Sequence, residues 1–557
     1  MIVNIGEYLR SSFEKELLFE ILHYDISYKI DASNYLFTSN QKITFKCKKN
    51  VNIIEGVLEE RLIVDFIEIR NKKTHKKILF QWEIRNFEEP YVRDDGLEGI
   101  SGKVIVIELE KPLKAEQEIV VEINFHMNKE EIMKSKPKYM WTLCIHKDIS
   151  YSIEPYSGHY FMLIPTRLAA PFDIIIEYPK DQIACIPGNQ VSKKKQGNYN
   201  VEHYKSKMKN IPVFAISDYK KIAREKEGLG VLFYLYKHQN LNEELVDKTF
   251  EILQLYMSSF GDNRTRVYKC ATVGENPSKY LGGENKGNAI YYSEQFFSED
   301  LSEKSVFLFY ISGNAHEIYH NWNLFYSGVS GILSEWFGEG GANFIASWAI
   351  EKIIGAEEGA SIRESYLSDY IKKEGYNATE PLASASKLSG IKSRVLMYSF
   401  GALVWEQLKQ KVGENAIING LKKFYQRYPF QKRSYIDFFS CIQEETDVNV
   451  GKYMEQWTNY KTKIEIQIKD VTFEQQNENG KCKVSIEIIA DRDYEIITEL
   501  GYKFKKKSKW KTIPLHIHKK GENKLSFDCK EMPVIIQLDP YFRVPHTNID
   551  KCKWNKK

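Results

Sequence analysis

Two histidines and a glutamate within five consecutive positions are the first residues of this chain that could do chemistry. His316 and His320 are four positions apart, and Glu317 directly follows the first of them. On a helix, positions i and i+4 share a face, so both imidazoles can point at one metal ion. Zinc binds such nitrogen ligands tetrahedrally, and a catalytic zinc keeps one position for water, so one further protein ligand is needed. We therefore predict a zinc site in which Glu317 takes a proton from the bound water.

The third zinc ligand is expected from Glu339, in the segment Trp336-Phe337-Gly338-Glu339-Gly340. The 18 residues 321–338 separate it from His320, so it can reach the same metal ion from a second helix. The His-Glu-x-x-His pattern alone also fits a surface helix with a solvated face. For this pattern alone, such a surface helix is the alternative to a metal site.

The spacing resembles that of the membrane-alanyl (puromycin-sensitive) aminopeptidase family of zinc metallopeptidases, which carry HExxH-x18-E. Trp322 and the residues around Glu339 are similar to that family as well. The resemblance favours the metal site over the surface helix, and it implies one Zn²⁺ per chain, held by His316, His320 and Glu339. It also implies that the partners of the chain are peptide substrates with a free N-terminus.

A second element of the resemblance precedes the histidines. Glu284 lies 32 residues before His316, in Gly283-Glu284-Asn285-Lys286-Gly287, which is similar to the G-A-M-E-N-x-G strand of the family. There the glutamate holds the α-amine of the substrate, which implies substrate-binding roles for Gly283, Glu284 and Asn285. The three residues before Glu284 are Leu-Gly-Gly, which departs from the family. A glycine-rich turn with a solvent-facing glutamate is the alternative.

A third element is Tyr398, which lies 82 residues after His316 in Tyr398-Ser-Phe-Gly401-Ala402. This segment matches the Y-x-x-G-A element of the family, in which the tyrosine hydroxyl donates to the oxyanion of the tetrahedral intermediate. The chain has 35 tyrosines, so a core tyrosine in a helix is the alternative. The position of Tyr398 relative to the other two motifs favours the catalytic role.

The periodicity of apolar residues indicates how the chain is organised. Residues 1–22 fit a short amphipathic helix, and a period of two, typical of strands, follows from Tyr24. A period of 3.6 begins near residue 240, and strand patterns return near residue 461. We predict a multidomain α+β protein with an N-terminal β-sandwich over residues 1–222, a mainly helical catalytic domain over 223–460 and a small β-sandwich over 461–557.

The resemblance adds detail to this domain order. It implies that the catalytic domain is thermolysin-like. Many relatives continue into a long helical domain that roofs the active site, and this chain ends where that domain would begin. We therefore expect a short form with a more open cleft that admits longer peptides. Trp322-Asn323, just after the second motif histidine, and the Gly-Gly-Glu element are also similar to the related glycyl aminopeptidases.

The composition of the chain bears on its partners and on its cellular compartment. Net charge is +4, from 79 Lys and Arg against 75 Asp and Glu, so no global field favours nucleic acid or a membrane. No signal-peptide pattern opens the chain, and no apolar run approaches the roughly 18 residues that span a bilayer. The eight scattered cysteines are read as buried free thiols. We expect a cytoplasmic protein with no nucleic-acid partner and no membrane partner, and leave the oligomeric state open.

Two lysine-rich stretches have ordinary structural explanations. Lys193–Lys195 are read as the tip of a hairpin. The grouped lysines between 503 and 511 are read as a solvated strand-and-turn edge, where lysine blocks edge pairing. A nucleic-acid patch is the alternative for the second stretch.

The combined motifs predict a zinc-dependent aminopeptidase that hydrolyses the first peptide bond of its substrate. A zinc endopeptidase or another zinc hydrolase on the same fold is one alternative, because fold does not determine substrate. A non-catalytic scaffold, as in a relative associated with the TATA-binding protein, is another. The complete set of Glu317, Tyr398 and metal ligands argues against the scaffold, which needs none of them.

Overall fold

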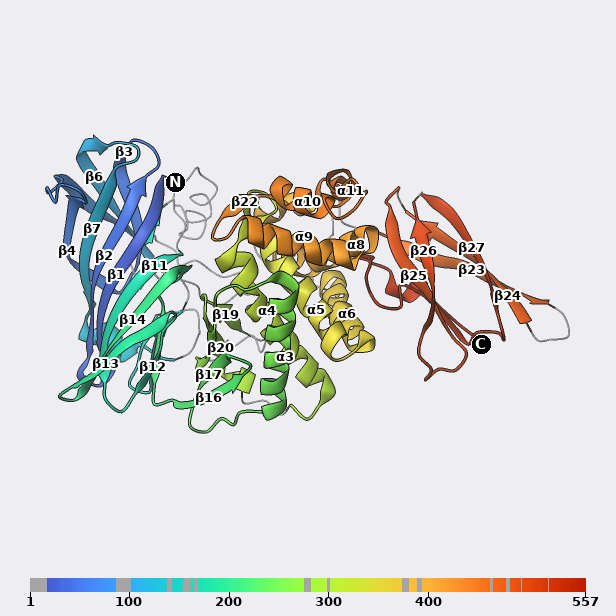
Figure 1. Ribbon diagram of the computed structural model, residues 1–557, viewed down its shortest axis with the longest axis horizontal. Coiled ribbons are helices and arrows are strands. Elements are labelled where there is room, and N and C mark those ends of the chain that lie inside the picture. The colour runs from blue at the N-terminus through green and yellow to red at the C-terminus, as the bar shows by residue number, and fades with distance from the viewer. Residues whose placement is uncertain are drawn as a thin grey trace. The chain divides into compact units, whose positions relative to one another are not determined.

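A computed structural model (Figure 1) describes residues 18–86, 102–137, 143–153, 162–164, 169–274, 282–297, 301–372, 380–387, 393–460, 464–476, 481–491, 493–518 and 520–556. The chain divides into two compact units. The first unit comprises Met1–Phe250 and Arg264–Glu303, and the second comprises Glu251–Asn263 and Lys304–Lys557. Most of the helix expected over residues 1–22 lies outside the described residues, and its last four positions, 19–22, belong to the first strand instead.

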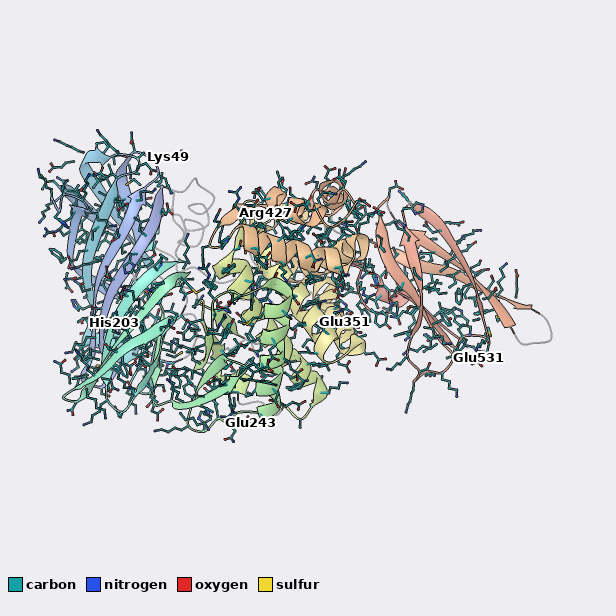
Figure 2. The ribbon with its side chains drawn as sticks, viewed as in Figure 1. Lys49, His203, Glu243, Glu351, Arg427 and Glu531 are labelled. Carbon is teal, nitrogen blue, oxygen red and sulfur yellow. The ribbon has the colours of Figure 1, made fainter. Side chains whose placement is uncertain are left out.

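Each unit carries exposed charged side chains, some of which are labelled in Figure 2. Lys49, Glu243 and Glu531 are exposed examples. All eight cysteines, in contrast, are buried free thiols, which confirms that expectation. Among the described residues, no helix combines the length and the apolar character that crossing a membrane requires.

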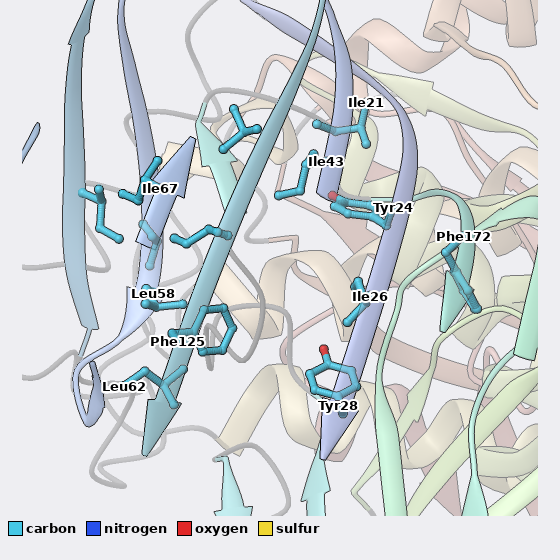
Figure 3. Close-up of a cluster of buried hydrophobic side chains, with 14 of the residues drawn as sticks. Ile21, Tyr24, Ile26, Tyr28, Ile43, Leu58, Leu62, Ile67, Phe125 and Phe172 are labelled. Carbon is cyan, nitrogen blue, oxygen red and sulfur yellow. The ribbon is translucent and has the colours of Figure 1, made fainter. Parts of the chain in front are cut away.

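The first unit is dominated by two sheets that share one apolar core. A seven-stranded sheet has the order β13-β14-β11-β1-β2-β7-β4, and a four-stranded sheet has the order β10-β3-β6-β5. Figure 3 shows that core, in which Tyr24 of β1 and Ile43 of β2 lie in the same cluster as Leu58 of β3. The strands are β1 (Phe19–Asp31), β2 (Leu36–Cys47), β3 (Val51–Glu59), β4 (Leu62–Asn71), β5 (Phe80–Asn86), β6 (Gly102–Leu113), β7 (Glu118–Met127), β10 (Met162–Ile164), β11 (Ala170–Pro179), β13 (Asn189–Gln196) and β14 (Tyr199–Asn210).

Alternation along β1 shows why this sequence forms a half-buried strand. Alternate side chains of a strand point to opposite faces, so the core residues should recur every second position. They do so at Tyr24, Ile26, Tyr28 and Ile30. A β-bulge between Ile21 and His23 adds one residue, which keeps the preceding apolar positions on the core face.

The lysines at 193–195 are not at the tip of their hairpin, so that prediction was wrong. They lie along β13, whose side chains are all exposed, and the turn follows at Gly197, where φ is +60°. β13 is at the edge of the seven-stranded sheet. A lysine-rich edge strand resists pairing with another chain, so charge without apolar alternation can still form a strand here.

Two smaller sheets complete the first unit. One has the order β12-β15-β9-β8, and the other has the order β16-β17-β18-β20-β19. In the second of these, β17, β18 and β20 are parallel, while β19 runs antiparallel to β20 at the edge. Residue 222 lies within β16, and the division into three domains stays a prediction. The strands are β8 (Cys144–Ile145), β9 (Ile149–Ser152), β12 (Ile183–Cys185), β15 (Phe214–Ser217), β16 (Lys220–Lys226), β17 (Leu229–Leu235), β18 (Val267–Val273), β19 (Gly283–Asn285) and β20 (Ala289–Ser293). The helix α3 (Glu243–Phe260) is divided between the two units after Phe250.

Helices dominate the second unit from residue 304 to residue 458, which confirms the predicted helical middle region. Three π-helical segments, η4, η5 and η7, interrupt them, and such segments occur frequently at functional sites. The elements are α4 (Lys304–His320), η4 (Asn321–Tyr326), β21 (Gly328–Ser330), η5 (Trp336–Gly340), α5 (Gly341–Ile353), α6 (Ala356–Lys372), η7 (Val395–Phe400), α8 (Gly401–Val412), α9 (Glu414–Arg427), β22 (Lys432–Ser434), α10 (Tyr435–Gln443) and α11 (Val450–Thr458).

Strands return at the C-terminal end, as predicted, in sheets of order β23-β24-β27 and β26-β25-β28-β29. The lysines between 503 and 511 lie at the β25–β26 hairpin, where Lys503 and Lys511 each lie over an aromatic ring. The strands are β23 (Ile466–Gln476), β24 (Lys481–Ala490), β25 (Ile496–Lys503), β26 (Lys511–Ile517), β27 (Gly521–Cys529), β28 (Ile535–Leu538) and β29 (Lys553–Asn555).

A buried polar seam joins these strands to the helices within the second unit. The side chain of Arg363, on α6, is 1% exposed. Its Nη1 lies 2.8 Å from a carboxylate oxygen of Glu351, which is labelled in Figure 2. Its Nε donates to the backbone oxygen of Tyr541. Gln407 of α8 donates to the backbone oxygens of Ile497 and Arg543. Removing one partner of a buried charge pair is strongly destabilising, so the seam favours one fixed arrangement of these elements.

Candidate metal centre

The two predicted histidine ligands lie at the C-terminal end of α4, on a face that is buried. His316 is 9% exposed and His320 is 4% exposed. The i, i+4 spacing brings their Nε2 atoms to 3.0 Å from each other, with the two rings nearly perpendicular. The ligand atoms of His316, Glu317 and His320 all lie within 4.8 Å of one another, which makes this group a candidate metal site.

Two asparagines determine which nitrogen of each imidazole faces the centre. His316 Nδ1 lies 2.8 Å from Asn343 Oδ1, and His320 Nδ1 lies 3.0 Å from Asn323 Oδ1. The amide nitrogen of Asn343 donates to the backbone oxygen of Tyr398, and that of Asn323 donates to two backbone oxygens of η5. Because each amide nitrogen is used in this way, each amide oxygen accepts a hydrogen bond from an imidazole Nδ1–H. Both Nε2 lone pairs are thereby directed to the centre, as in metal-ligating histidines.

Glu339 supplies the third atom. Its Oε2 lies 3.3 Å from His316 Nε2 and 3.5 Å from His320 Nε2. Burial raises the pKa of the Glu339 carboxyl, but the electrostatic and hydrogen-bond interactions of the carboxylate with the two imidazoles outweigh burial and hold the pKa well below its usual range. A divalent cation held by these residues would act in the same direction. Two imidazole nitrogens and one carboxylate oxygen are a donor set that fits catalytic zinc, so these residues fit the group that the motif implies.

A close backbone crossing places Glu339 and Tyr398 beside the histidines. A Cβ on Gly340 of η5 would lie 2.8 Å from the backbone oxygen of Met397, so only glycine fits against η7. Tyr398, on η7, stacks near His316, with ring centroids 6.1 Å apart and ring planes 12° apart. The guanidinium of Arg394 lies 6.0 Å from the centroid of the Tyr398 ring. The predicted residues of the second unit are therefore gathered around one point.

The indole rings beneath η5 support this crossing. Trp336 Nε1 donates to the backbone oxygen of Gly401, and Trp405 Nε1 donates to the backbone oxygen of Trp336. The two rings stack with centroids 4.5 Å apart. Each indole nitrogen thus satisfies a buried backbone acceptor while its ring fills the core, as buried tryptophans usually require.

The predicted substrate-binding residues lie in the first unit, on β19. Glu284 is 29% exposed, and its Oε2 lies 2.8 Å from Lys286 Nζ. The side-chain oxygen of Asn285 accepts a hydrogen bond from the backbone N–H of Gly287. Gly287 has a φ of +97°, and a Cβ there would meet the side chain of Asn210. β19 lies at the edge of its sheet. A strand must lie at an edge to pair with the backbone of a peptide.

Sequence reasoning did not predict the contacts of Asn323, Asn343 and Lys286 with the site residues. Asn323 follows His320 by three positions and Asn343 follows Glu339 by four, so helical spacing was the available signal. That spacing also occurs by chance on any polar helix face. Lys286 stands at the unspecified position of its motif, where the pattern gives no reason to examine it.

Removal of one ligand is expected to weaken metal binding. The purified chain should hold about one zinc ion, and His320→Ala or Glu339→Ala should bind zinc at least roughly tenfold more weakly, since even second-layer ligand changes reach that range. Metal analysis after dialysis against a graded chelator series measures this. Equal zinc content in the Glu339 variant and the unaltered protein would contradict the ligand assignment.

Gly340→Ala is expected to lower the free energy of unfolding by about 1–3 kcal/mol, because the added methyl overpacks a backbone crossing. The same variant should bind zinc more weakly, since η5 carries Glu339. Gly451→Ala is the matched control, because a Cβ at this helical glycine meets only one atom, at 3.8 Å. Thermal unfolding with and without a chelator compares the two. Equal melting temperatures for the two variants would contradict the crossing as the cause.

Comparison with known proteins identifies one part of the chain. Residues 245–457 match the family model described as the peptidase family M1 domain. This segment contains Glu284, the two histidines, Glu339 and Tyr398. No curated protein matches the chain.

Proposed function

Since residues 245–457 belong to peptidase family M1, a family of zinc metallopeptidases, we propose that this chain is an aminopeptidase that removes N-terminal residues from peptides. The observation that carries the proposal is the convergence of His316 Nε2, His320 Nε2 and Glu339 Oε2, with Glu317 beside them. Those four residues are the minimum that zinc-assisted hydrolysis of an amide needs.

The proposed reaction divides its tasks among named side chains. Zinc, when bound, supplies Lewis acidity that polarises a carbonyl and lowers the pKa of a water molecule toward about 7. Glu317 takes a proton from the attacking water and later gives it to the leaving amine, so it acts first as base and then as acid. The hydroxyl of Tyr398 donates a hydrogen bond to the oxyanion of the substrate.

The proposed substrate is a peptide with a free N-terminus. Glu284 pairs with the protonated α-amine through a charge-assisted hydrogen bond, which is stronger than a neutral one. Gly283 and Asn285 flank Glu284 on β19, and the peptide backbone pairs with this edge strand. A first residue that is held by its α-amine and by its backbone presents its peptide bond in a fixed orientation for attack.

Two other functions make different demands on the same residues. An endopeptidase, or another zinc hydrolase on this fold, would use the metal centre but have no need of Glu284. A scaffold would need neither Glu317 nor Tyr398. The complete ligand set, each imidazole with its own asparagine, supports catalysis over the scaffold.

A panel of unblocked aminoacyl amides tests the proposal most directly. The purified protein is assayed with added zinc, with a chelator, and with zinc restored after the chelator. Release of free amino acid that the chelator abolishes and zinc restores is the expected result. An inactive panel together with zinc-dependent cleavage of internal bonds would support the endopeptidase.

An acetylated N-terminus is expected to slow hydrolysis at least roughly tenfold in kcat/KM, which corresponds to about 1.4 kcal/mol. Acetylation removes the positive charge of the substrate amine, so the charge-assisted hydrogen bond proposed between that amine and Glu284 is lost. Glu284→Gln should narrow the gap between free and acetylated peptides. Matched peptide pairs measure kcat/KM in both proteins. Equal rates for free and blocked peptides in the unaltered protein would remove the aminopeptidase proposal.

A further inference from the structure

Lys286 forms an ion pair with Glu284, the residue proposed to hold the substrate amine. Lys286 Nζ lies 2.8 Å from Glu284 Oε2, within hydrogen-bond distance. Glu284 lies in β19, and Lys286 is the first residue after that strand. The pair therefore joins the strand that the proposal assigns to the substrate to the turn that follows it.

The lysine is the more deeply buried member of the pair. The side chain of Lys286 is 5% exposed, whereas that of Glu284 is 29% exposed. An ammonium group that has lost its hydration requires a carboxylate partner. Glu284 faces solvent and is the member that a ligand can reach, while Lys286 lies behind it as a fixed positive charge.

The backbone around Lys286 is also held in place. Its N–H donates to the backbone oxygen of Ala289, and the next N–H, of Gly287, donates to Asn285 Oδ1, both at 2.8 Å. Gly287 packs so closely on Asn210 that an added Cβ would lie 2.1 Å from Asn210 Oδ1. Three contacts thus hold the backbone of the turn between β19 and β20, from which the Lys286 side chain reaches Glu284.

We infer that Lys286 is a specificity-determining residue of this chain, which weakens the preference of Glu284 for a positively charged substrate amine. The inference rests on the proposed function, because it assumes that Glu284 contacts the α-amine. A substrate ammonium that approaches Glu284 meets a carboxylate already paired, and it also meets the like charge of Lys286. A substrate whose first residue carries no charge, such as an acetylated peptide, meets neither penalty.

Lys286→Met tests the inference, because methionine keeps an unbranched apolar stem of similar length and removes the charge. The measured quantity is the ratio of kcat/KM for a free peptide to kcat/KM for its acetylated counterpart. We expect this ratio to rise roughly tenfold over that of the unaltered protein, mainly through a lower KM for the free peptide. In Glu284→Gln/Lys286→Met, the rise should disappear, since the carboxylate that benefits is gone.

Two further variants keep the test decisive. Lys286→Gln removes the charge but keeps a polar group, so it serves if the methionine variant does not fold. Lys29→Met is the matched control. Lys29 pairs with Glu177 at 2.7 Å on the seven-stranded sheet, with the lysine side chain 42% exposed. This control should leave the ratio as it is in the unaltered protein.

The results separate this inference from the proposed function. A folded Lys286→Met or Lys286→Gln variant whose ratio stays within about twofold of the unaltered protein would overturn the inference, even if free peptides are hydrolysed well. An unaltered protein that releases no amino acid from any free peptide would overturn the proposed function instead. A ratio that rises in Lys286→Met and equally in the double variant would show that Lys286 acts without Glu284, which also overturns the inference.

Discussion

Glu317→Gln is expected to keep its zinc and to lose nearly all turnover, with kcat lower by about three to four decades. General acid–base catalysis contributes roughly two to four decades, and Glu317 serves twice in the proposed reaction. Glutamine has almost the same shape as glutamate but cannot take a proton. It leaves His316, His320 and Glu339 in place as ligands, so the metal should stay.

Zinc content and kcat, measured on the same preparation, test this expectation. Glu364→Gln is a suitable control, because Glu364 is an exposed glutamate of α6 in the same unit. It should retain both zinc and turnover. Loss of zinc from Glu317→Gln would make Glu317 a ligand or a structural residue, and unchanged kcat would exclude it as the base.

Tyr398→Phe is expected to lower kcat by about two to three decades with little change in KM. The hydroxyl is proposed to meet the oxyanion, which exists only in the transition state and the intermediate, so ground-state binding should be unaffected. Loss of a single oxyanion donor has an effect of about 3 kcal/mol in other enzymes. Phenylalanine keeps the ring that lies against His316 and beneath Arg394, so the change is confined to the hydroxyl.

A tyrosine with a structural role gives the opposite pattern and serves as the control. The hydroxyl of Tyr425 lies 2.6 Å from that of Tyr319 in the core of the second unit. Tyr425→Phe removes this buried hydrogen bond, which should lower the free energy of unfolding by about 1 kcal/mol and leave kcat unchanged. If Tyr398→Phe loses stability and keeps kcat, Tyr398 is a core residue and has no part in catalysis.

The order of the structural regions was largely readable from the sequence. Apolar alternation along β1 and β7, and the helical periodicity from residue 304 onward, depend on which side of a single element faces the core. A local pattern carries that information. At Lys193–Lys195, where charged residues replace the apolar pattern, the sequence analysis predicted a turn, and the structure has a strand. An edge strand needs no buried face, so its sequence need not alternate.

For the candidate site, too, part of the prediction rested on a local pattern. The spacing of His316 and His320 determines by itself that both imidazoles share one helix face, because the helix repeat is a property of the backbone. The identity of the third ligand and of Tyr398 came from the resemblance to a family. These assignments needed no knowledge of the packing around them.

Only the tertiary structure decided what surrounds those residues. The asparagines that orient each imidazole come from η4 and α5, and the approach of η5 to η7 depends on a glycine at the crossing. The structure also shows that Lys286 pairs with Glu284 and that the lysine is the more deeply buried of the two. Hydrogen-bond partners, burial and close backbone contacts are set by elements that meet across the fold. The spacing of residues along one element therefore determines which side chains can act together, and packing between elements determines their charge, orientation and partners.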